Sequence, residues 1–508
     1  MILFAVSYMR SAARWRSINM TFRLLFLALI VFGAGLGRGV AQQSDPVRIG
    51  TKAFTESVVL GELIRQSAEA DGHPVQLTRQ LGGTQILWSA ITGGDIDVYP
   101  DYTGTLSEEI FSGRDIESQD DLRDALEEFG IRMTQPLGFN NTYAIGMKKE
   151  VAEQKSIQTI SDLKDHPDLV YGFSNEFMDR SDGWPGLRRA AELSPASVRG
   201  LDHDLAYRGL EAGTIDIIDL YSTDPEIGYY DIRVLEDDIG FFPTYEAVIL
   251  YRNDLDPAVV ESLRRFEGMI TENDMAEMNA AVKIDRQDDG AVAAAFLSKQ
   301  FDFESTFVAE TLYDRLLKHT ADHLVLVGIS LGMAIVVSIP LGILAVKVRT
   351  LEAVLLGLVG ILQTIPSLAL LVFMIPLFGI GTVPAIAALF LYSLLPIVRN
   401  THAGIKNIGL PLMESARALG LPNGLVLRKI ELPLAMPSIL AGVKTSAVIN
   451  VGTATLGALI GAGGYGQPIL TGIRLDSVPL ILEGAVPAAL LALLVQGFFD
   501  LVEKWFER

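Results

Sequence analysis

The sequence of 508 residues contains no cysteine and only six histidines. The absence of cysteine excludes disulfides, thiolate metal sites and a cysteine nucleophile. Only His319 and His323 are spaced to share a helical face, and no third ligand accompanies them, so we expect no metal site. The sequence also lacks a G-x-x-x-x-G-K-[ST] phosphate loop, and the Gly-rich stretch 461–467 has no lysine. We therefore expect no bound cofactor and no ATP site of the usual kind.

Basic residues are scarce relative to acidic ones, and the imbalance is local. The chain has 41 Lys and Arg against 61 Asp and Glu. Residues 45–323 hold 25 basic and 53 acidic residues, whereas 324–508 hold 11 and 8. Nucleic-acid binding needs basic residues that neutralise phosphates, so we expect no nucleic-acid partner. The pattern indicates an acidic, soluble part joined to a nearly neutral, apolar part.

The N-terminus combines arginines with a short apolar run. Arg10, Arg14 and Arg16 precede the stretch TFRLLFLALIVFGAGLG at 21–37, and small residues follow it. This order is typical of a secretory signal peptide, which we place at 1–41, with an uncleaved N-terminal anchor as the alternative. Met20 would make a more usual start. Either interpretation puts the following segment on the periplasmic or extracellular side.

Residues 45–305 alternate short apolar strands with helical stretches. Strands such as VRIG, LVYGF and EAVILY are separated by segments such as DDLRDALEEFG. This alternation predicts an α/β domain with mostly parallel sheets, and its length favours two lobes. The following stretch 306–321 is interpreted as a linker, which looks helical rather than loose.

The remainder, 322–508, is dominated by apolar stretches that approach the ~20 residues needed to cross a bilayer. We predict five spans, at 322–346, 352–377, 380–398, 436–461 and 479–502. Lysines and arginines concentrate after the first span, around the loop between the third and fourth, and at the C-terminus, which places those segments in the cytoplasm. The sequence therefore predicts an all-α, multi-pass domain in the inner membrane.

A charged segment, ESARALGLPNGLVLRKIELP, interrupts this membrane domain at 414–433. Its spacing predicts two short helices joined by a turn at Gly420, with Pro433 ending the second helix. We place the whole loop at 405–435. It would expose four charged residues, namely Glu414, Arg417, Arg428 and Lys429. Such a projecting pair suits docking to a soluble partner.

At these residues the sequence resembles the coupling loop, or "EAA" motif, of ABC-importer permeases. The resemblance rests on Glu-Ser-Ala at 414–416, Gly420 and Leu432-Pro433, and Ser415 departs from the alanine of the strict pattern. The stretch ILQTIPSLALLVFMIPLFGIG at 361–381 is also similar to permeases of the betaine and choline group. The resemblance implies a separate ABC ATPase subunit that contacts Glu414, Ala416, Gly420 and Pro433. It also implies a homodimer of permease domains, surrounded by membrane lipid.

Six motifs in the soluble part resemble substrate-binding proteins of glycine betaine and related osmoprotectant importers. They are VRIGTKAFTE (47–56), DVYPDYTGTL (97–106), FNNTYAIG (139–146), NEFMDRSDGWPGL (175–187), DLYSTD (219–224) and FFPTYEAVIL (241–250). The resemblance implies a two-lobed periplasmic-binding-protein clamshell of type II. It also implies a pocket lined by Lys52, Tyr102, Thr105, Tyr143, Arg180, Tyr221 and Tyr245.

The chemistry of these residues suits a quaternary amine. Tyrosine faces attract a quaternary ammonium group, and Arg, Lys and Thr side chains can bind a carboxylate. Alternatively, each tyrosine packs in a core, and Arg180 pairs with Asp179 or Asp182. Two cations facing the ligand favour a zwitterion such as glycine betaine over a bare cation. Choline, carnitine and ergothioneine stay as alternatives.

Two other classes of protein were weighed against an importer subunit. A membrane-anchored ligand sensor without transport would need a signalling domain, which we do not recognise. A periplasmic hydrolase would need a nucleophile and base, and we find neither G-x-S-x-G nor H-E-x-x-H. We therefore expect a transporter subunit rather than an enzyme.

Overall fold

The computed structural model describes residues 45–301 and 307–507. The expected signal peptide or anchor at 1–41 lies outside the described residues. Residues 45–301 form two five-stranded sheets covered by helices, and residues 307–507 are helical.

The first sheet has the strand order β2-β1-β3-β10-β4. Its strands are β1 (Val47–Gly50), β2 (Val75–Thr78), β3 (Val98–Tyr102), β4 (Ile131–Met133) and β10 (Ala247–Arg252). β1 is parallel to β2 and β3, and β10 is antiparallel to β3 and β4. Because β10 comes from a distant part of the sequence, the chain must leave this sheet and return to it.

The second sheet repeats the arrangement with the order β7-β6-β8-β5-β9. Its strands are β5 (Tyr143–Lys148), β6 (Val170–Ser174), β7 (Ser197–Leu201), β8 (Ile217–Tyr221) and β9 (Ile232–Val234). β6 is parallel to β7 and β8, and β5 is antiparallel to β8 and β9. The strands are therefore mostly parallel, as the sequence predicts, with one reversed strand in each sheet.

Two connections join the sheets. The chain passes from β4 to β5 through residues 134–142 and from β9 to β10 through 235–246, and a bridge between Asn140 and Glu246 ties these connections together. Two sheets joined by two crossing segments confirm the predicted two-lobed α/β fold.

Helices cover both sheets. Those of the first lobe are α2 (Thr55–Ala70), α3 (Thr84–Gly93), α4 (Thr103–Thr105), α5 (Gln119–Glu127), α11 (Pro257–Arg264), α12 (Glu272–Lys283) and α13 (Asp289–Phe301). The second lobe has α6 (Lys149–Lys155), α7 (Asn175–Asp179), α8 (Trp184–Ala190), α9 (His203–Glu211) and α10 (Glu226–Tyr229), with a 3₁₀ turn at Ser161–Asp165. A π-helical turn, η1 (Leu106–Ile110), follows α4 directly. Nearly every residue of α2 is buried, so this helix places its first turn in the interior of the domain.

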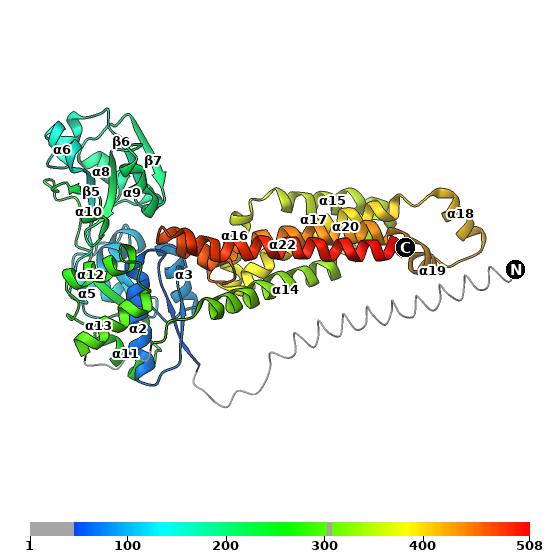
Figure 1. Ribbon diagram of the computed structural model, residues 1–508, viewed down its shortest axis with the longest axis horizontal. Helices are drawn as coiled ribbons and strands as arrows, with labels where there is room; N and C mark the ends of the chain where they lie inside the picture. The colour runs from blue at the N-terminus through cyan, green and yellow to red at the C-terminus, as the bar shows by residue number, and fades with distance from the viewer. Residues whose placement is uncertain (1–44, 302–306, 508) are drawn as a thin grey trace. The chain divides into compact units, whose positions relative to one another are not determined.

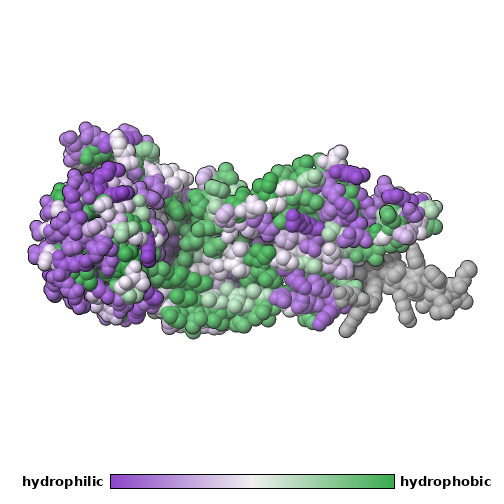
Figure 2. Space-filling model, turned by 90° about the horizontal axis from the view of Figure 1, so that it is seen from above, coloured by the Kyte–Doolittle hydropathy of each residue, from purple (hydrophilic) through white to green (hydrophobic). Residues whose placement is uncertain are grey.

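The C-terminal part contains four helices long and apolar enough to span a membrane, among the residues that the structure describes. The helical elements are α14 (Leu312–Lys347), α15 (Arg349–Thr364), α16 (Ser367–Phe378), α17 (Thr382–Lys406), α18 (Leu410–Ala418), α19 (Asn423–Val426), α20 (Leu432–Thr453), α21 (Gly466–Arg474) and α22 (Val478–Glu507). The long helices α14, α17, α20 and α22 run side by side and contact one another (Figure 1). Hydrophobic residues cover much of this helical part (Figure 2), as expected for a surface in contact with lipid.

The predicted second span, 352–377, is not one straight helix. It forms two helices, α15 and α16, which are bent by 100° relative to each other. The segment counts as a fifth span only if this bent pair is taken as one span. Ile365 is extended because the following Pro366 disfavours the helical conformation in the residue before it. The hydroxyl of Tyr392 donates to the Ile365 carbonyl that the break leaves free.

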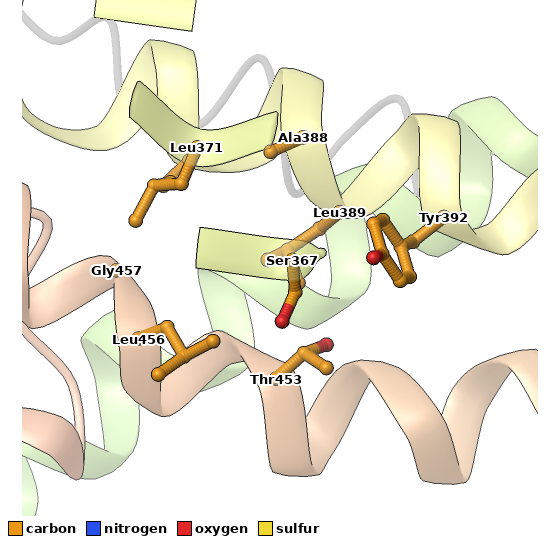
Figure 3. Close-up of a pocket in the computed structure, with 9 residues that line it drawn as sticks. Ser367, Leu371, Ala388, Leu389, Tyr392, Thr453, Leu456 and Gly457 are labelled. Atoms are coloured by element: carbon orange, nitrogen blue, oxygen red, sulfur yellow. The ribbon is translucent and has the colours of Figure 1, made fainter. Parts of the chain in front are cut away.

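A small apolar pocket lies beside this bend. Its lining comes from α16, α17, the end of α20 and the following 3₁₀ turn, η4 (Ala454–Ile460), and the hydroxyls of Ser367 and Thr453 face each other across it (Figure 3). Deeper in the bundle, Asn450 donates to the Ser330 hydroxyl at 3.0 Å and accepts from the Ser393 hydroxyl at 2.9 Å. Such buried hydrogen bonds between helices fix their packing.

Helix α14 joins the predicted linker to the first predicted span without a break. Thr311 caps it by accepting a hydrogen bond from the Asp314 amide, and it runs for 36 residues to Lys347. Arg315 in its first turn donates to both carboxylate oxygens of Glu483 at the start of α22. The second half of the linker is therefore helical, as its composition suggests, and the pair between Arg315 and Glu483 fixes it to α22.

Candidate functional site

The four tyrosines singled out in the sequence lie where strands of the two sheets end. Tyr102 ends β3, Tyr221 ends β8 and Tyr143 begins β5, where it is paired with Tyr221 in register. Tyr245 precedes β10 by two residues, in the second crossing connection. The fold therefore brings Tyr102 and Tyr245, which are 143 positions apart in the sequence, to the region between the lobes.

Their rings form one aromatic cluster. The Tyr143 ring centre lies 5.1 Å from that of Tyr221 and 5.6 Å from that of Tyr245. Phe54 links the remaining tyrosine, because its ring lies 6.3 Å from Tyr102 and 5.4 Å from Tyr221. Sequence reasoning missed Phe54, although it stands inside the motif VRIGTKAFTE, immediately before α2.

Trp184 does not belong to this cluster. Its ring packs on Tyr171 at 5.6 Å and on Phe173 at 5.3 Å, and only 7% of the residue is exposed. These contacts place Trp184 in the core of the second lobe. Its position in the motif DGWPG is explained by packing.

Lys52 is buried and paired. It follows β1, and its Nζ donates to Asp101 Oδ1 at 2.6 Å, with 4% of Lys52 and none of Asp101 exposed. The same Nζ lies 5.8 Å from the centre of the Tyr102 ring. Thr105, at the end of α4, is also buried. Lys52 is thus at the tyrosine cluster, and its charge is balanced within the protein.

Arg180 has two carboxylate partners. It follows α7, donates through Nε to Asp182 Oδ1 at 2.8 Å and through Nη2 to Oδ2, and donates through Nη1 to Glu109 Oε2 at 2.5 Å. Its guanidinium carbon lies 5.4 Å from the centre of the Tyr143 ring, and Asp182 also accepts a 2.5 Å hydrogen bond from the Tyr245 hydroxyl. The ion pair between Arg180 and Asp182, which the sequence analysis gives as the alternative, is therefore present, and Arg180 also contacts the tyrosine cluster.

Glu56, which sequence reasoning missed, occupies the first turn of α2 and contacts both lobes. Its carboxylate accepts hydrogen bonds from the Tyr102 hydroxyl, Asn141 Nδ2, the Thr223 hydroxyl and Asn279 Nδ2, at 2.5 to 2.9 Å. Burial raises the pKa of Glu56, and the four donors oppose that rise. A fully satisfied buried carboxylate of this kind fixes the positions of the groups around it.

His203 packs against one ring of the cluster, that of Tyr221. Its ring stacks on Tyr221 with centres 4.4 Å apart, and its Nε2 lies 3.0 Å from Asp224 Oδ2. Burial opposes the charged form, but Asp224 and Asp219 outweigh it and raise the pKa of His203 to about 9. An imidazolium therefore stacks on Tyr221 at neutral pH.

The loop at 405–435 has a different shape from the expected one after its first helix. α18 ends at Ala418, and Gly420 makes the turn with a φ of 68°, as predicted. The second helix does not end at Pro433, because α19 continues through a π-helical turn, η3 (Leu427–Glu431), into α20. Proline normally clashes with the carbonyl four residues earlier, and the wider π-helical turn relieves that clash.

The loop exposes its charges and several apolar side chains. Glu414 is exposed, Ala416 is buried, and the exposed leucines are Leu410, Leu412, Leu419 and Leu425. At its base, Lys347 pairs with the buried Glu431. Glu352 pairs with Lys406 and lies 3.0 Å from His402 Nε2. The projecting part is thus accessible and its two ends are fixed to neighbouring helices.

No group of three or more potential metal ligands occurs within the described parts of the chain, 45–301 and 307–507.

Comparison with known proteins defines the class of the chain. Residues 45–299 match the substrate-binding domain of ABC-type glycine betaine transport systems, and residues 338–508 match the inner membrane component of binding-protein-dependent transport systems. The chain is therefore a substrate-binding domain fused to a permease of an ABC importer. It belongs to the ABC-type glycine betaine transport family.

Individual relatives resemble different parts of the chain. The glycine betaine/carnitine/choline transport system permease protein OpuCB of Bacillus subtilis (strain 168) is 42% identical over 189 residues, which are 37% of this chain and 87% of that protein. The ergothioneine transport permease/ergothioneine binding protein EgtU of Helicobacter pylori (strain G27) is 31% identical over 270 residues, which are 51% of this chain and 48% of that protein. A crystal structure of a glycine betaine/carnitine/choline ABC transporter is 28% identical, with a TM-score of 0.43, and covers 50% of this chain and 98% of that chain.

Proposed function

We propose that this chain captures a quaternary amine outside the inner membrane and carries it through a permease that a separate ATPase subunit drives. The binding domain comprises 45–305, the linker 306–321, and the permease domain 322–508 with its coupling loop at 405–435. The permease domain pairs with a second copy within the lipid bilayer. The aromatic cluster between the two lobes is the observation that carries the proposal.

The cluster supports a trimethylammonium ligand on physical grounds. Tyr102, Tyr143, Tyr221 and Tyr245 supply ring faces, each worth about 2 kcal/mol or more toward a desolvated cation. In this proposal, the other end of the ligand lies toward Lys52, Thr105 and Arg180. Glycine betaine is the first ligand to test, and choline, carnitine and ergothioneine are the alternatives.

The coupling loop supports an ATPase partner. Glu414 projects into solvent from α18, and exposed leucines flank it. Exposed apolar side chains around a charged residue are typical of a protein-binding surface. We propose that Glu414, Ala416, Gly420 and Pro433 contact the ATPase subunit and transmit its movement to the membrane helices.

Calorimetric titration of the full chain in lipid nanodiscs with the four ligands tests the proposal. Saturable heat with at least one of them, lost in Tyr221→Ala, is expected. Uptake of that ligand into vesicles that also contain the ATPase subunit distinguishes an importer from a ligand sensor. Binding without ATP-dependent uptake would support the sensor.

A further inference from the structure

Glu109 occupies a position between the lobes that neither the sequence nor the family resemblance singles out. It lies in the π-helical turn η1 of the first lobe and contacts Arg180 in the second. A second contact between the lobes lies next to it, in which the Ser181 hydroxyl donates a hydrogen bond to the Glu108 carbonyl at 3.0 Å. π-Helical turns occur frequently at functional sites, and this one brings a carboxylate of the first lobe to Arg180 of the second lobe.

The bonds of Arg180 determine what the guanidinium can offer a ligand. Asp182 uses the edge formed by Nε and Nη2, and Glu109 uses Nη1. A ligand carboxylate binds best to two parallel N–H groups on one edge. The remaining edge is formed by Nη1 and Nη2, and both nitrogens already donate to carboxylates. Each of these nitrogens still carries a second N–H group. A ligand carboxylate that binds this edge therefore lies directly beside the Glu109 carboxylate and is repelled by it.

The second cation expected to bind a carboxylate is engaged as well. Lys52 donates to the buried Asp101 at 2.6 Å. The other oxygen of Glu109 accepts from Gln85 Nε2 at 3.1 Å, which holds the carboxylate in place. The side chain of Glu109 is only 18% exposed, so little water competes for Arg180. The protein thus supplies its own carboxylates to both cations.

We propose that Glu109 is a specificity-determining residue, whose carboxylate on Arg180 repels a ligand carboxylate at the same guanidinium and so disfavours carboxylate-bearing quaternary amines relative to carboxylate-free ones. This inference rests on the proposed function. A ligand carboxylate at Arg180 either lies beside the Glu109 carboxylate or breaks the ion pair between Glu109 and Arg180. A ligand with a hydroxyl in that place leaves the pair between Glu109 and Arg180 intact.

Glycine betaine and choline form a matched pair for the test, because both carry a trimethylammonium group. Glycine betaine has a carboxylate where choline has a hydroxymethyl group. We would titrate the full chain in lipid nanodiscs with each and compare the ratio of the two Kd values. Glu109→Gln removes the charge and keeps the shape. It is expected to shift the ratio by about tenfold toward glycine betaine, which corresponds to one hydrogen bond between charged groups.

Glu108→Gln is the control, because it removes the same charge one residue away on the same turn, and it should leave the ratio within about twofold. Glu109→Asp, which keeps the charge, should stay closer to the wild type than Glu109→Gln does. An unchanged ratio, or an equal loss of both affinities as expected of a brace between lobes, would overturn the inference while leaving the proposed function in place. A wild-type chain that binds neither choline, glycine betaine, carnitine nor ergothioneine would overturn both.

Discussion

Lys347 and Glu431 join the end of the first long membrane helix to the base of the coupling loop. The Nζ of Lys347, the last residue of α14, donates to both carboxylate oxygens of Glu431, at 2.7 and 2.6 Å. Glu431 is only 3% exposed and ends the π-helical turn that leads into α20. Movement of the loop therefore has a direct mechanical connection to α14.

Breaking this pair should impair coupling. Lys347→Met leaves the buried Glu431 unpaired, which costs about 1–3 kcal/mol and lowers Tm. We expect ATPase activity that no longer responds to ligand, with ligand affinity unchanged, measured on the full chain assembled with its ATPase subunit. The charge-swapped double variant Lys347→Glu, Glu431→Lys should recover part of the response. Full ligand stimulation in Lys347→Met would show that the pair does not transmit movement.

Removing the central ring of the aromatic cluster should weaken binding. Tyr221→Ala deletes a face that contacts Tyr143, Phe54 and His203, so we expect the affinity for a quaternary amine to fall by about 30-fold, or about 2 kcal/mol. Calorimetric titration measures the change. Tyr229→Ala is the matched control, since Tyr229 is 64% exposed in the same lobe. Equal losses in both variants would argue against the cluster as the binding site.

The projecting charge of the coupling loop should matter for transport and not for folding. Glu414→Ala removes an exposed side chain, so Tm should change little. We expect ATP-dependent uptake to fall by about tenfold or more if Glu414 is a central contact of the ATPase. Ser415→Ala is the control, because the hydroxyl of this exposed residue donates to the Pro411 carbonyl of its own helix and alanine fits the motif. Normal uptake in Glu414→Ala would exclude the proposed role.

The stability of the binding domain should depend on pH through His203. Its pKa rises from 6.5 to about 9 in the folded state, so its contribution is fully present below pH 6.5 and is lost as the pH rises through 9. A shift of this size corresponds to about 3 kcal/mol. His203→Gln should lower Tm near pH 6, and the difference from wild type should shrink by pH 9.5. His166→Gln, outside this network, is the control, and a constant difference at every pH would contradict the assignment.

The class of the protein and the positions of its tyrosines could be predicted because both depend on local sequence. Tyr102 and Tyr221 end apolar strand patterns, and strand ends of an α/β lobe face the ligand. The pair between Arg180 and Asp182 could be expected from their closeness in sequence, whereas the contact with Glu109 could not, because Glu109 reaches Arg180 only when the two lobes meet. The partner of Lys52 was missed because Asp101 lies far from it in the sequence. Glu56 was missed for the same reason, since its four donors come from separate elements.

The errors in the membrane part have local physical causes. Proline was taken to end a helix at Pro433, yet a preceding π-helical turn accommodates it. The predicted span at 352–377 is bent rather than straight, because Pro366 forces Ile365 into an extended conformation. Hydrophobicity predicts which segments enter the membrane, and it does not determine how the backbone adapts to proline.

Because one chain runs from α13 through the linker into α14, every permease domain is made with a receptor of its own. A cell cannot raise the number of receptors without also raising the number of membrane domains. The rate of uptake at low solute concentration then depends on the affinity of each fused binding domain and on the rate at which it delivers solute. Selection for scavenging would therefore act on the residues of the cleft rather than on the expression level of the receptor.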